Sequence, residues 1–299
     1  MARLELHLDD AIDFTRYFVP EAFTPLFYTP LYAELTPEQR RRYNQLHGCY
    51  CNEQIMFFEK FIAENVLSGV GRARGLEAMR PELSVFLNEE RRHARMFRDW
   101  NLRCLPHLYG RNEFYFVVMP AGLKVVLDWS TKRPWFFALF VWLMLLQEER
   151  AVFLGREVLR RKDELEPHFV ALQRAHLADE IDHVEWDQEI LAAIWGSASA
   201  GARRILAALF CRMLEEFMIT PKRSNLRVIA ELANEFAELK TRFEGMRRAL
   251  LALECSRDWN LSLYSRATVP KTFALFDRWP EFAPLSRVLC GYWPNSENR

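Results

Sequence analysis

Four long segments with helical periodicity, in two pairs separated by a long connection, limit this chain to a small number of folds. The segments run over about 37–67, 75–104, 133–160 and 165–195. The connection, over 105–132, carries two prolines and two glycines. Two helical hairpins joined by a long crossover form a four-helix bundle of the ferritin-like type. We therefore predict an all-α, ferritin-like four-helix bundle.

Local signals at two of these segments support helices. Thr36 can cap the first segment, Pro37 suits the first helical position, and Gln39 completes a capping box. The most apolar run of the chain, from Trp135 to Leu146, is too short to span a bilayer, which needs about 20 apolar residues. Because two glutamates follow it directly, we predict that it forms half of a deeply buried helix.

The remaining segments are expected to complete one domain over residues 1–299. Residues 1–36, with three prolines and many aromatic residues, should form an ordered N-terminal arm on the 37–195 metal-binding bundle. Additional helices are expected over about 202–219 and 225–254. The tail from Asn260 onward is rich in proline and tryptophan and should wrap the body.

Composition excludes several classes of protein. The 40 basic and 40 acidic residues give zero formal net charge, whereas nucleic-acid binding needs a basic field. None of the six cysteines forms a CxxC pair, which argues against zinc-ribbon and thioredoxin-type sites. The first residues lack the apolar core of a signal peptide, so we expect a cytoplasmic protein without a membrane partner.

Two Glu-x-x-His motifs, Glu90 to His93 and Glu180 to His183, lie in the second and fourth segments. A three-residue step places both side chains on one helix face, where a carboxylate and an imidazole can bind the same metal ion. About 0.7 such motifs would arise by chance in this composition, so their number alone means little. Their placement means more, because ferritin-like di-metal sites take this motif from each of two helices.

The other two helices should each add one glutamate at the same depth. The first segment offers Glu53, which lies level with Glu90 across a turn near residues 71–72. A helical wheel favours Glu53 over Glu59 because Glu53 lies nearer the apolar face. The third segment offers Glu148 and Glu149, and periodicity does not separate them. Both hairpins would place these residues roughly 22–27 Å from their turns.

A third histidine extends the set. His176 lies four residues before Glu180 and seven before His183, so one stripe of the helix presents two imidazoles and a carboxylate. Four carboxylates would balance the charge of two divalent ions, and imidazoles would complete their coordination. Glu89 and Asp179 precede the motif glutamates, and either orient the histidines or are simply solvated. Iron and manganese both accept such ligands.

The pattern of these residues resembles the di-iron p-aminobenzoate N-oxygenases, the enzymes of the aureothin and chloramphenicol nitro-group pathways. The residues that form this pattern are Glu53, Glu89, Glu90, His93, Glu149, His176, Glu180 and His183. The histidine four residues before the second motif is its most specific element. The family commonly has Asp-Glu where this chain has Glu89-Glu90, which is a departure from the pattern.

The resemblance implies the roles of the residues and favours Glu149 over Glu148. Two irons would be bridged by Glu90 and Glu180. Glu53 and His93 would complete one iron, and Glu149, His176 and His183 would complete the other. It further implies O2 activation, oxygen transfer to an amine or arylamine nitrogen, an electron donor or reductase, and a homodimer.

Residues one turn from these ligands are expected to line a substrate pocket, although each serves equally well as core. They are Met56, Phe57, Phe86, Leu145 and Phe153. Arg223 and Arg227 are candidate anchors for a polar group of the substrate or ordinary surface charges.

Three other functions compete with N-oxygenation. The first is iron handling by a ferritin- or rubrerythrin-like protein. The second is a di-iron or manganese–iron oxidase acting on a C–H bond. The third is a helical interaction protein whose inner carboxylates pair with arginines.

Overall fold

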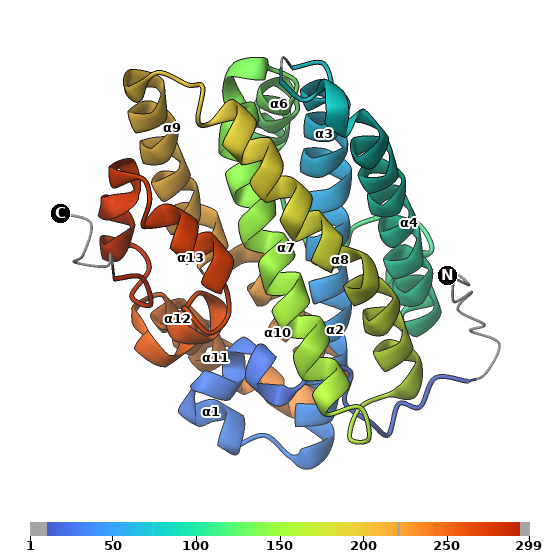
Figure 1. The fold of residues 1–299 in the computed structure, drawn as a ribbon. Helices are drawn as coiled ribbons and strands as arrows, with labels where there is room; N and C mark the ends of the chain where they lie inside the picture. The colour runs from blue at the N-terminus through green and yellow to red at the C-terminus, as the bar shows by residue number, and fades with distance from the viewer. Residues whose placement is uncertain (1–10, 74, 220–221, 294–299) are drawn as a thin grey trace.

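The computed structural model describes residues 11–73, 75–219 and 222–293. The first ten residues of the predicted arm and the last six of the tail therefore lie outside the described residues. Within the described ranges every regular element is a helix, and only two isolated β-bridges occur. The prediction of an all-α, ferritin-like fold is confirmed (Figure 1).

The first long rod of the bundle consists of three consecutive segments. Helix α2 covers Pro37–Phe58, a π-helical turn, η3, covers Glu59–Ala63, and α3 covers Glu64–Val70. The predicted capping box is confirmed, since Thr36 and Gln39 each accept a hydrogen bond from the other's backbone N–H.

The other three rods are α4 (Arg80–Cys104), α7 (Phe137–Arg160) and α8 (Pro167–Ile194). Helix α2 packs along α4, α7 packs along α8, and α4 contacts α8. The four rods run side by side in Figure 1. Short 3-10 turns, η4 (Glu77–Met79) and η5 (Pro134–Phe136), precede α4 and α7.

The crossover contains more helix than the sequence indicated. Helices α5 (Pro106–Tyr109) and α6 (Ala121–Thr131) lie within the predicted connection over 105–132. Pro120 immediately precedes α6. Proline is compatible with a helix start because the first backbone N–H groups of a helix have no intrahelical partner.

The apolar run in α7 lies in the centre of the protein. Every residue from Phe137 to Leu146 is buried, as predicted. Trp142 packs against Trp195, Phe276 and Phe282, at ring-centroid distances of 5.6, 5.3 and 4.7 Å. Both the bundle and the C-terminal helices therefore cover this half of α7.

The described part of the N-terminal arm is ordered against the bundle, as predicted. It contains η1 (Glu21–Phe23), η2 (Pro25–Tyr28) and α1 (Pro30–Ala33). The side chain of Asn44 accepts from the backbone N–H groups of Phe18 and Val19 and donates to the Val19 carbonyl. These bonds fix the arm to α2.

The chain after α8 forms a layer of short helices. They are α9 (Ala200–Met213), the π-turn η6 (Leu214–Met218), α10 (Lys222–Glu235), η7 (Ala237–Arg242), α11 (Phe243–Ala252), η8 (Leu253–Cys255), α12 (Arg257–Leu263), α13 (Pro270–Phe276) and η9 (Pro280–Arg287). The single helix predicted over 225–254 is wrong, because Phe236 adopts an extended backbone conformation and separates α10 from η7.

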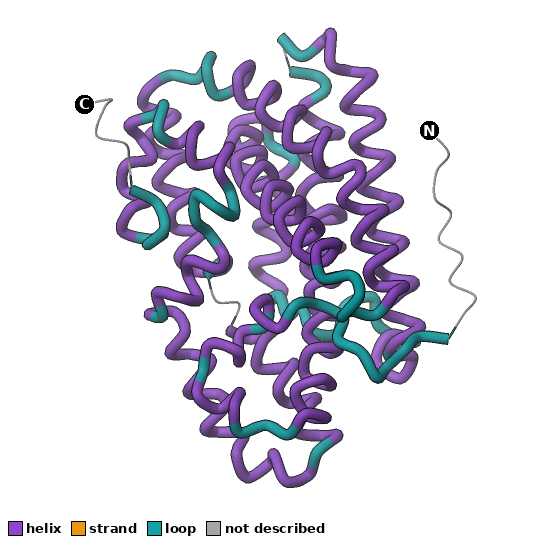
Figure 2. Tube along the Cα trace, turned by 60° about the horizontal axis from the view of Figure 1, so that its bottom comes forward, coloured by secondary structure: helices purple, strands orange, loops and turns teal. Residues whose placement is uncertain are grey.

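This layer covers two rods of the bundle. Helix α10 packs on α2, while α9 and α13 pack on α7. Figure 2 shows that the described chain, including this layer, is mostly helical, with short loops between the helices. Across the described ranges, helices with the length and apolar character needed to cross a membrane are absent.

Candidate metal centre

Five of the seven predicted ligands lie together in the middle of the bundle. They are Glu90, His93, His176, Glu180 and His183. One group joins Glu59, His93, His176 and Glu180, and a second joins Glu90, His93, Glu180 and His183. Within each group the candidate ligand atoms all lie within 4.8 Å of one another. His93 and Glu180 belong to both groups, and every member is buried.

Glu180 lies at the centre of this arrangement. Its Oε1 atom is 2.7 Å from Nε2 of His176, 3.5 Å from Nδ1 of His93 and 3.4 Å from Nδ1 of His183. The Nδ1 atom of His183 is also 3.1 Å from Oε1 of Glu90. Imidazoles from two helices thus converge on one carboxylate.

The donor atoms of this cluster have the character of metal ligands. Apart from close contacts with the histidines of the cluster and with Glu148, both oxygens of Glu59, Glu90 and Glu180 are buried without a hydrogen-bond partner in the described chain. The same holds for Nδ1 of His93 and His183 and for Nε2 of His176. Buried polar atoms without partners are costly, and carboxylates with imidazoles suit ferrous ions. The residues present therefore fit a metal centre.

The outer nitrogens of two histidines are held by carboxylates. Nε2 of His93 lies 2.9 Å from Oδ2 of Asp179, and Nε2 of His183 lies 3.2 Å from Oε2 of Glu89. Each acid lies next to the motif glutamate of one helix and holds the histidine of the other. Glu89 and Asp179 therefore contact the histidines rather than being simply solvated, and such contacts can fix the ring orientation.

The electrostatics show a surplus of buried carboxylates. Burial, together with the charges of Glu180 and Glu90, raises the pKa of Glu148 well above its usual value. Burial also raises the pKa of Glu59 to about 8. Although burial opposes its ionisation, Glu180 has a pKa well below the usual value because His176 and His183 stabilise its charge. Divalent cations would relieve the repulsion among these groups.

Asp187 is an additional acid that the sequence analysis missed. It is fully buried, both of its oxygens lack hydrogen-bond partners, and burial raises its pKa well above normal. It lies one turn beyond His183 on α8. The alternating steps of four and three residues from His176 through Glu180 and His183 continue to Asp187. This spacing is the sequence signal that could have identified Asp187.

Glu53 does not join the cluster. Its carboxylate accepts hydrogen bonds from the Tyr109 hydroxyl and from the backbone N–H groups of three crossover residues, Tyr115, Phe116 and Val117. These bonds tie the crossover to α2 and use both carboxylate oxygens. Glu59 lies beside the histidines instead, and its Oε1 atom is 3.4 Å from Nε2 of His176.

The carboxylate of Glu149 also binds backbone N–H groups and lies apart from the cluster. Its two oxygens accept hydrogen bonds from the backbone N–H groups of Lys271 and Thr272, at 2.7 and 2.8 Å, in the first turn of α13. Carboxylates at this position satisfy the free N–H groups of a helix start. Glu148, whose carboxyl group lies beside that of Glu180, faces the cluster instead.

The turn after the first rod explains why Glu59 replaces Glu53. The helix continues to Val70 and α4 begins at Arg80, so the turn is centred near residue 75 rather than 71–72. Gly75, with a φ of 86°, adopts the left-handed conformation at this centre. Glu59 and Glu90 lie almost equally far from it. The π-turn that begins at Glu59 also shifts the helix face, which a straight helical wheel does not represent.

A cavity of about 690 Å³ reaches the cluster, and Glu59, Glu148 and His176 form part of its wall. Of the predicted pocket residues, Phe57 and Phe153 line it. The other three, Met56, Phe86 and Leu145, are buried in the core. The Phe86 ring stacks on His183, with centroids 4.0 Å apart.

The two candidate anchors for a polar group of the substrate have different surroundings. Arg223 lines the cavity, whereas Arg227 lies over the Tyr115 ring and donates to the Tyr115 carbonyl.

Comparison with known protein families identifies the chain. The sequence model described as p-aminobenzoate N-oxygenase AurF matches residues 6–250. The chain belongs to this family. Members of the AurF family are di-iron N-oxygenases, so the protein is an oxidoreductase, and the suspected resemblance is confirmed. The match covers the complete bundle and both Glu-x-x-His motifs. No curated protein matches the chain.

AurF family membership gives the buried cluster a chemical context. An oxygenase of this family needs a small-molecule substrate and O2. The cluster of histidines and glutamates provides groups that can hold metal, and the cavity beside it provides space for a substrate.

Proposed function

We propose that this protein holds two iron ions and uses O2 to oxygenate the nitrogen of an amine or arylamine. The observation that carries the proposal is the convergence of buried carboxylate and imidazole atoms from three of the four rods, with Glu148 of the fourth rod beside Glu180. We assign the ligands Glu59, Glu90, His93, Glu148, His176, Glu180 and His183. Glu59 and Glu148 replace the predicted Glu53 and Glu149 because those two carboxylates bind backbone N–H groups.

Charge balance supports a pair of divalent ions. Glu59, Glu90, Glu148 and Glu180 supply four negative charges in a site without a buried lysine or arginine among the groups described around it. Two divalent ions would neutralise these charges, and buried charges persist only when they are compensated. Glu180, which lies between the three histidines, is suited to bridge the ions.

The overall reaction defines what else is needed. An amine R–NH2, O2, two electrons and two protons give the hydroxylamine R–NHOH and water. Bound ferrous ions would supply the electrons that activate O2 and would be reduced again by an electron donor. We propose a reductase or small reductant for this role, and a homodimer as the assembly.

The protein itself supplies orientation and exclusion of water. Asp179 and Glu89 hold the outer nitrogens of His93 and His183, so each ring presents its other nitrogen to the centre. Phe86 covers the face of His183, and Phe97 packs at 4.9 Å from the ring of His176. The substrate can approach from the cavity side, where Glu59 and Glu148 form the wall.

Metal analysis tests this proposal most directly. Protein reconstituted anaerobically with ferrous ion should contain about two irons per chain, and its spectrum should change when O2 is admitted. Turnover with an arylamine, a reductant and 18O2 should label the hydroxylamine oxygen. Iron content well below one per chain would contradict the assignment. Labelled carbon-hydroxylated product would support C–H oxidation instead.

Size measurement addresses the ferritin-like alternative. A monomer or dimer in solution agrees with an oxygenase, while a 24-chain shell would identify an iron-storage subunit. The layer of short helices covering α2 and α7 favours the small assembly, because it occupies bundle faces that a shell subunit would use for contacts.

A further inference from the structure

Arg150 is a partly buried cation that faces the cavity without a counter-ion. Its guanidinium donates a 3.4 Å hydrogen bond to Oε1 of Gln147 and lies 5.3 Å from the ring centroid of Tyr264. It forms no ion pair within the described chain. The carboxylate of its neighbour Glu149 accepts hydrogen bonds from backbone N–H groups at the start of α13 instead of pairing with Arg150. Arg150 is partly withdrawn from water and has no acidic partner, so this position is suited to an anionic ligand.

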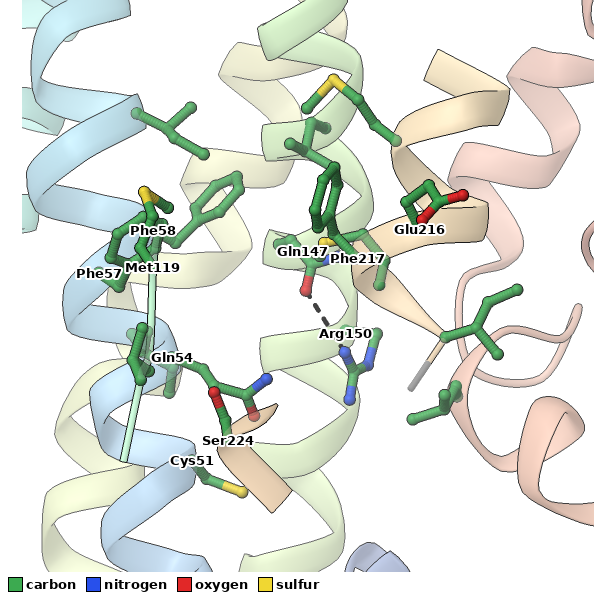
Figure 3. Close-up of a pocket in the computed structure, with 18 of the residues that line it drawn as sticks. Cys51, Gln54, Phe57, Phe58, Met119, Gln147, Arg150, Glu216, Phe217 and Ser224 are labelled. Carbon is green, nitrogen blue, oxygen red and sulfur yellow. Dashed lines mark hydrogen bonds between the residues drawn. The ribbon is translucent and has the colours of Figure 1, made fainter. Parts of the chain in front are cut away.

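Neutral polar groups surround the same end of the cavity. The buried hydroxyl of Tyr50 and Nδ1 of buried His47 have no hydrogen-bond partner of ordinary geometry among the described residues, and both side chains line the cavity. Figure 3 shows Arg150 extending toward the space bordered by Gln54, Cys51 and Ser224. A bound carboxylate would accept hydrogen bonds from several of these groups.

The other acids of the cavity wall do not compete for Arg150. Glu59 and Glu148 belong to the metal centre proposed above. Glu216 is paired with Arg212 outside the cavity, with Nη2 and Oε1 2.6 Å apart. The positive charge of Arg150 therefore remains available to a ligand.

The opposite end of the cavity is apolar. Its wall there is formed by Leu123, Leu127, Phe136, Leu139, Phe140 and Leu143, from α6, η5 and α7. Lining residues on η5 and α7 extend from Phe136 to Leu154, which is about 27 Å by helical rise. A volume of about 690 Å³ is in the range of cavities that hold drug-sized ligands, far larger than one benzene ring.

We propose that the substrate is an elongated amphipathic acid that also carries the amine oxidised in the proposed function, with its carboxylate at Arg150 and its apolar chain or ring system beneath α6. The inference rests on the proposed function only for which atom is oxidised. Cys51 and Gln54, which lie near the Arg150 side chain in Figure 3, precede Glu59 by eight and five residues. This corresponds to about 7–12 Å along α2, so the carboxylate would lie roughly two helical turns from Glu59 on that helix.

Calorimetric titration of iron-loaded, anaerobic protein tests the binding part. The probes are dodecanoate, dodecan-1-ol and benzoate. We expect dodecanoate to bind at least tenfold more tightly than either other probe, because only it combines the charge with the apolar length. Equal affinity for dodecan-1-ol would overturn the role of the charge, and equal affinity for benzoate would overturn the elongated shape.

Substitution of Arg150 tests the anchor. Arg150→Met should weaken dodecanoate binding roughly 10- to 100-fold, the size of a lost charge-assisted hydrogen bond, and leave dodecan-1-ol binding within twofold. Arg156→Met, on the exposed side of the same helix, should change neither. Unchanged dodecanoate affinity in Arg150→Met, with native helix content and iron content, would refute the anchor.

A second variant tests the apolar end. Leu127→Trp adds volume beneath α6, so it should weaken dodecanoate binding about tenfold or more while leaving hexanoate binding within twofold. An equal loss for both acids, or no loss for either, would contradict placement of the chain there.

The two proposals can fail separately. Charge- and length-dependent binding to a protein without iron would refute the proposed function and retain the acid-binding cavity. Two bound irons without selectivity for dodecanoate would support the metal centre and refute the acid-binding cavity.

Discussion

Oδ2 of Asp179 lies 2.9 Å from Nε2 of His93, on the far side of the ring from the nitrogen that faces Glu180. Asp179 also forms an ion pair with Arg92, which fixes its carboxylate beside α4. Glu89 holds His183 in the corresponding way from the opposite helix. The two Glu-x-x-His helices thus orient each other's histidines.

Removing this contact should weaken iron binding without unfolding the protein. We expect Asp179→Asn to lower iron affinity about 10- to 100-fold, as is typical when a partner of a metal-bound histidine is lost. Competition with a chelator measures the change. Asp182→Asn, at an exposed position of the same helix, is the control and should bind iron normally. Equal affinities of the two variants would argue against an orienting role for Asp179.

The two glutamates of the first rod should behave oppositely when replaced. Glu59→Ala is expected to lose at least one of the two irons while remaining folded. Glu53→Ala should retain iron but lose about 3 kcal/mol or more of unfolding free energy, because buried backbone N–H groups would lose their acceptor. Iron analysis and denaturant titration of both variants provide the measurement. Iron loss confined to Glu53→Ala would restore the original ligand assignment.

The same comparison applies to α7. Glu148→Ala should reduce iron content, since Glu148 lies beside Glu180. Glu149→Ala should instead destabilise the packing of α13 by roughly 1–3 kcal/mol, because it removes the acceptor for two backbone N–H groups. Hydrogen exchange at Lys271 and Thr272 should increase only in the Glu149 variant. Protection that is unchanged there would contradict the capping role.

Acid should destabilise the protein partly through His47. Burial, with a smaller contribution from the positive charge of Arg150, lowers the pKa of His47 to about 3 against the opposing effect of the Phe23 backbone. Between pH 6.5 and 3 the unfolded chain binds a proton at this site and the folded chain does not. Stability therefore falls as the pH drops through this window, by up to about 1.4 kcal/mol per pH unit from this group.

The variant His47→Gln isolates this contribution. Its unfolding free energy, measured by denaturant titration, should decline less steeply than that of the parent between pH 6 and 4. His107→Gln, at an exposed histidine, serves as the control for the loss of an imidazole. Identical slopes in all three proteins would exclude His47 as a source of the acid sensitivity.

Metal binding should stabilise the fold. A ligand that binds only the folded state adds about 2.7 kcal/mol at a concentration 100 times its dissociation constant. Ferrous ion should therefore raise the melting temperature of metal-free protein at neutral pH. The variant Glu180→Ala, which lacks the central carboxylate, should show a much smaller increase with unchanged helix content.

The bundle and the centre of the site follow from local patterns in the sequence. Periodicity located the four rods, and local spacing placed Glu90 with His93 and His176 with Glu180 and His183, because residues three or four positions apart share a helix face. The capping box at Thr36 and the buried run in α7 also depend on neighbours in sequence, so the chain alone was sufficient for them.

Neighbouring carboxylates, in contrast, differ in contacts that form only when the chain folds. Glu53 and Glu149 are each within reach of the bundle interior by sequence pattern, but backbone N–H groups of the crossover and of α13 bind them. Those partners are 62–64 and 122–123 residues away along the chain. The choice of Glu59 over Glu53 also needed the true position of the turn and the π-turn at Glu59. Periodicity carries no information about such distant partners, and therefore did not separate a structural carboxylate from one facing the metal groups.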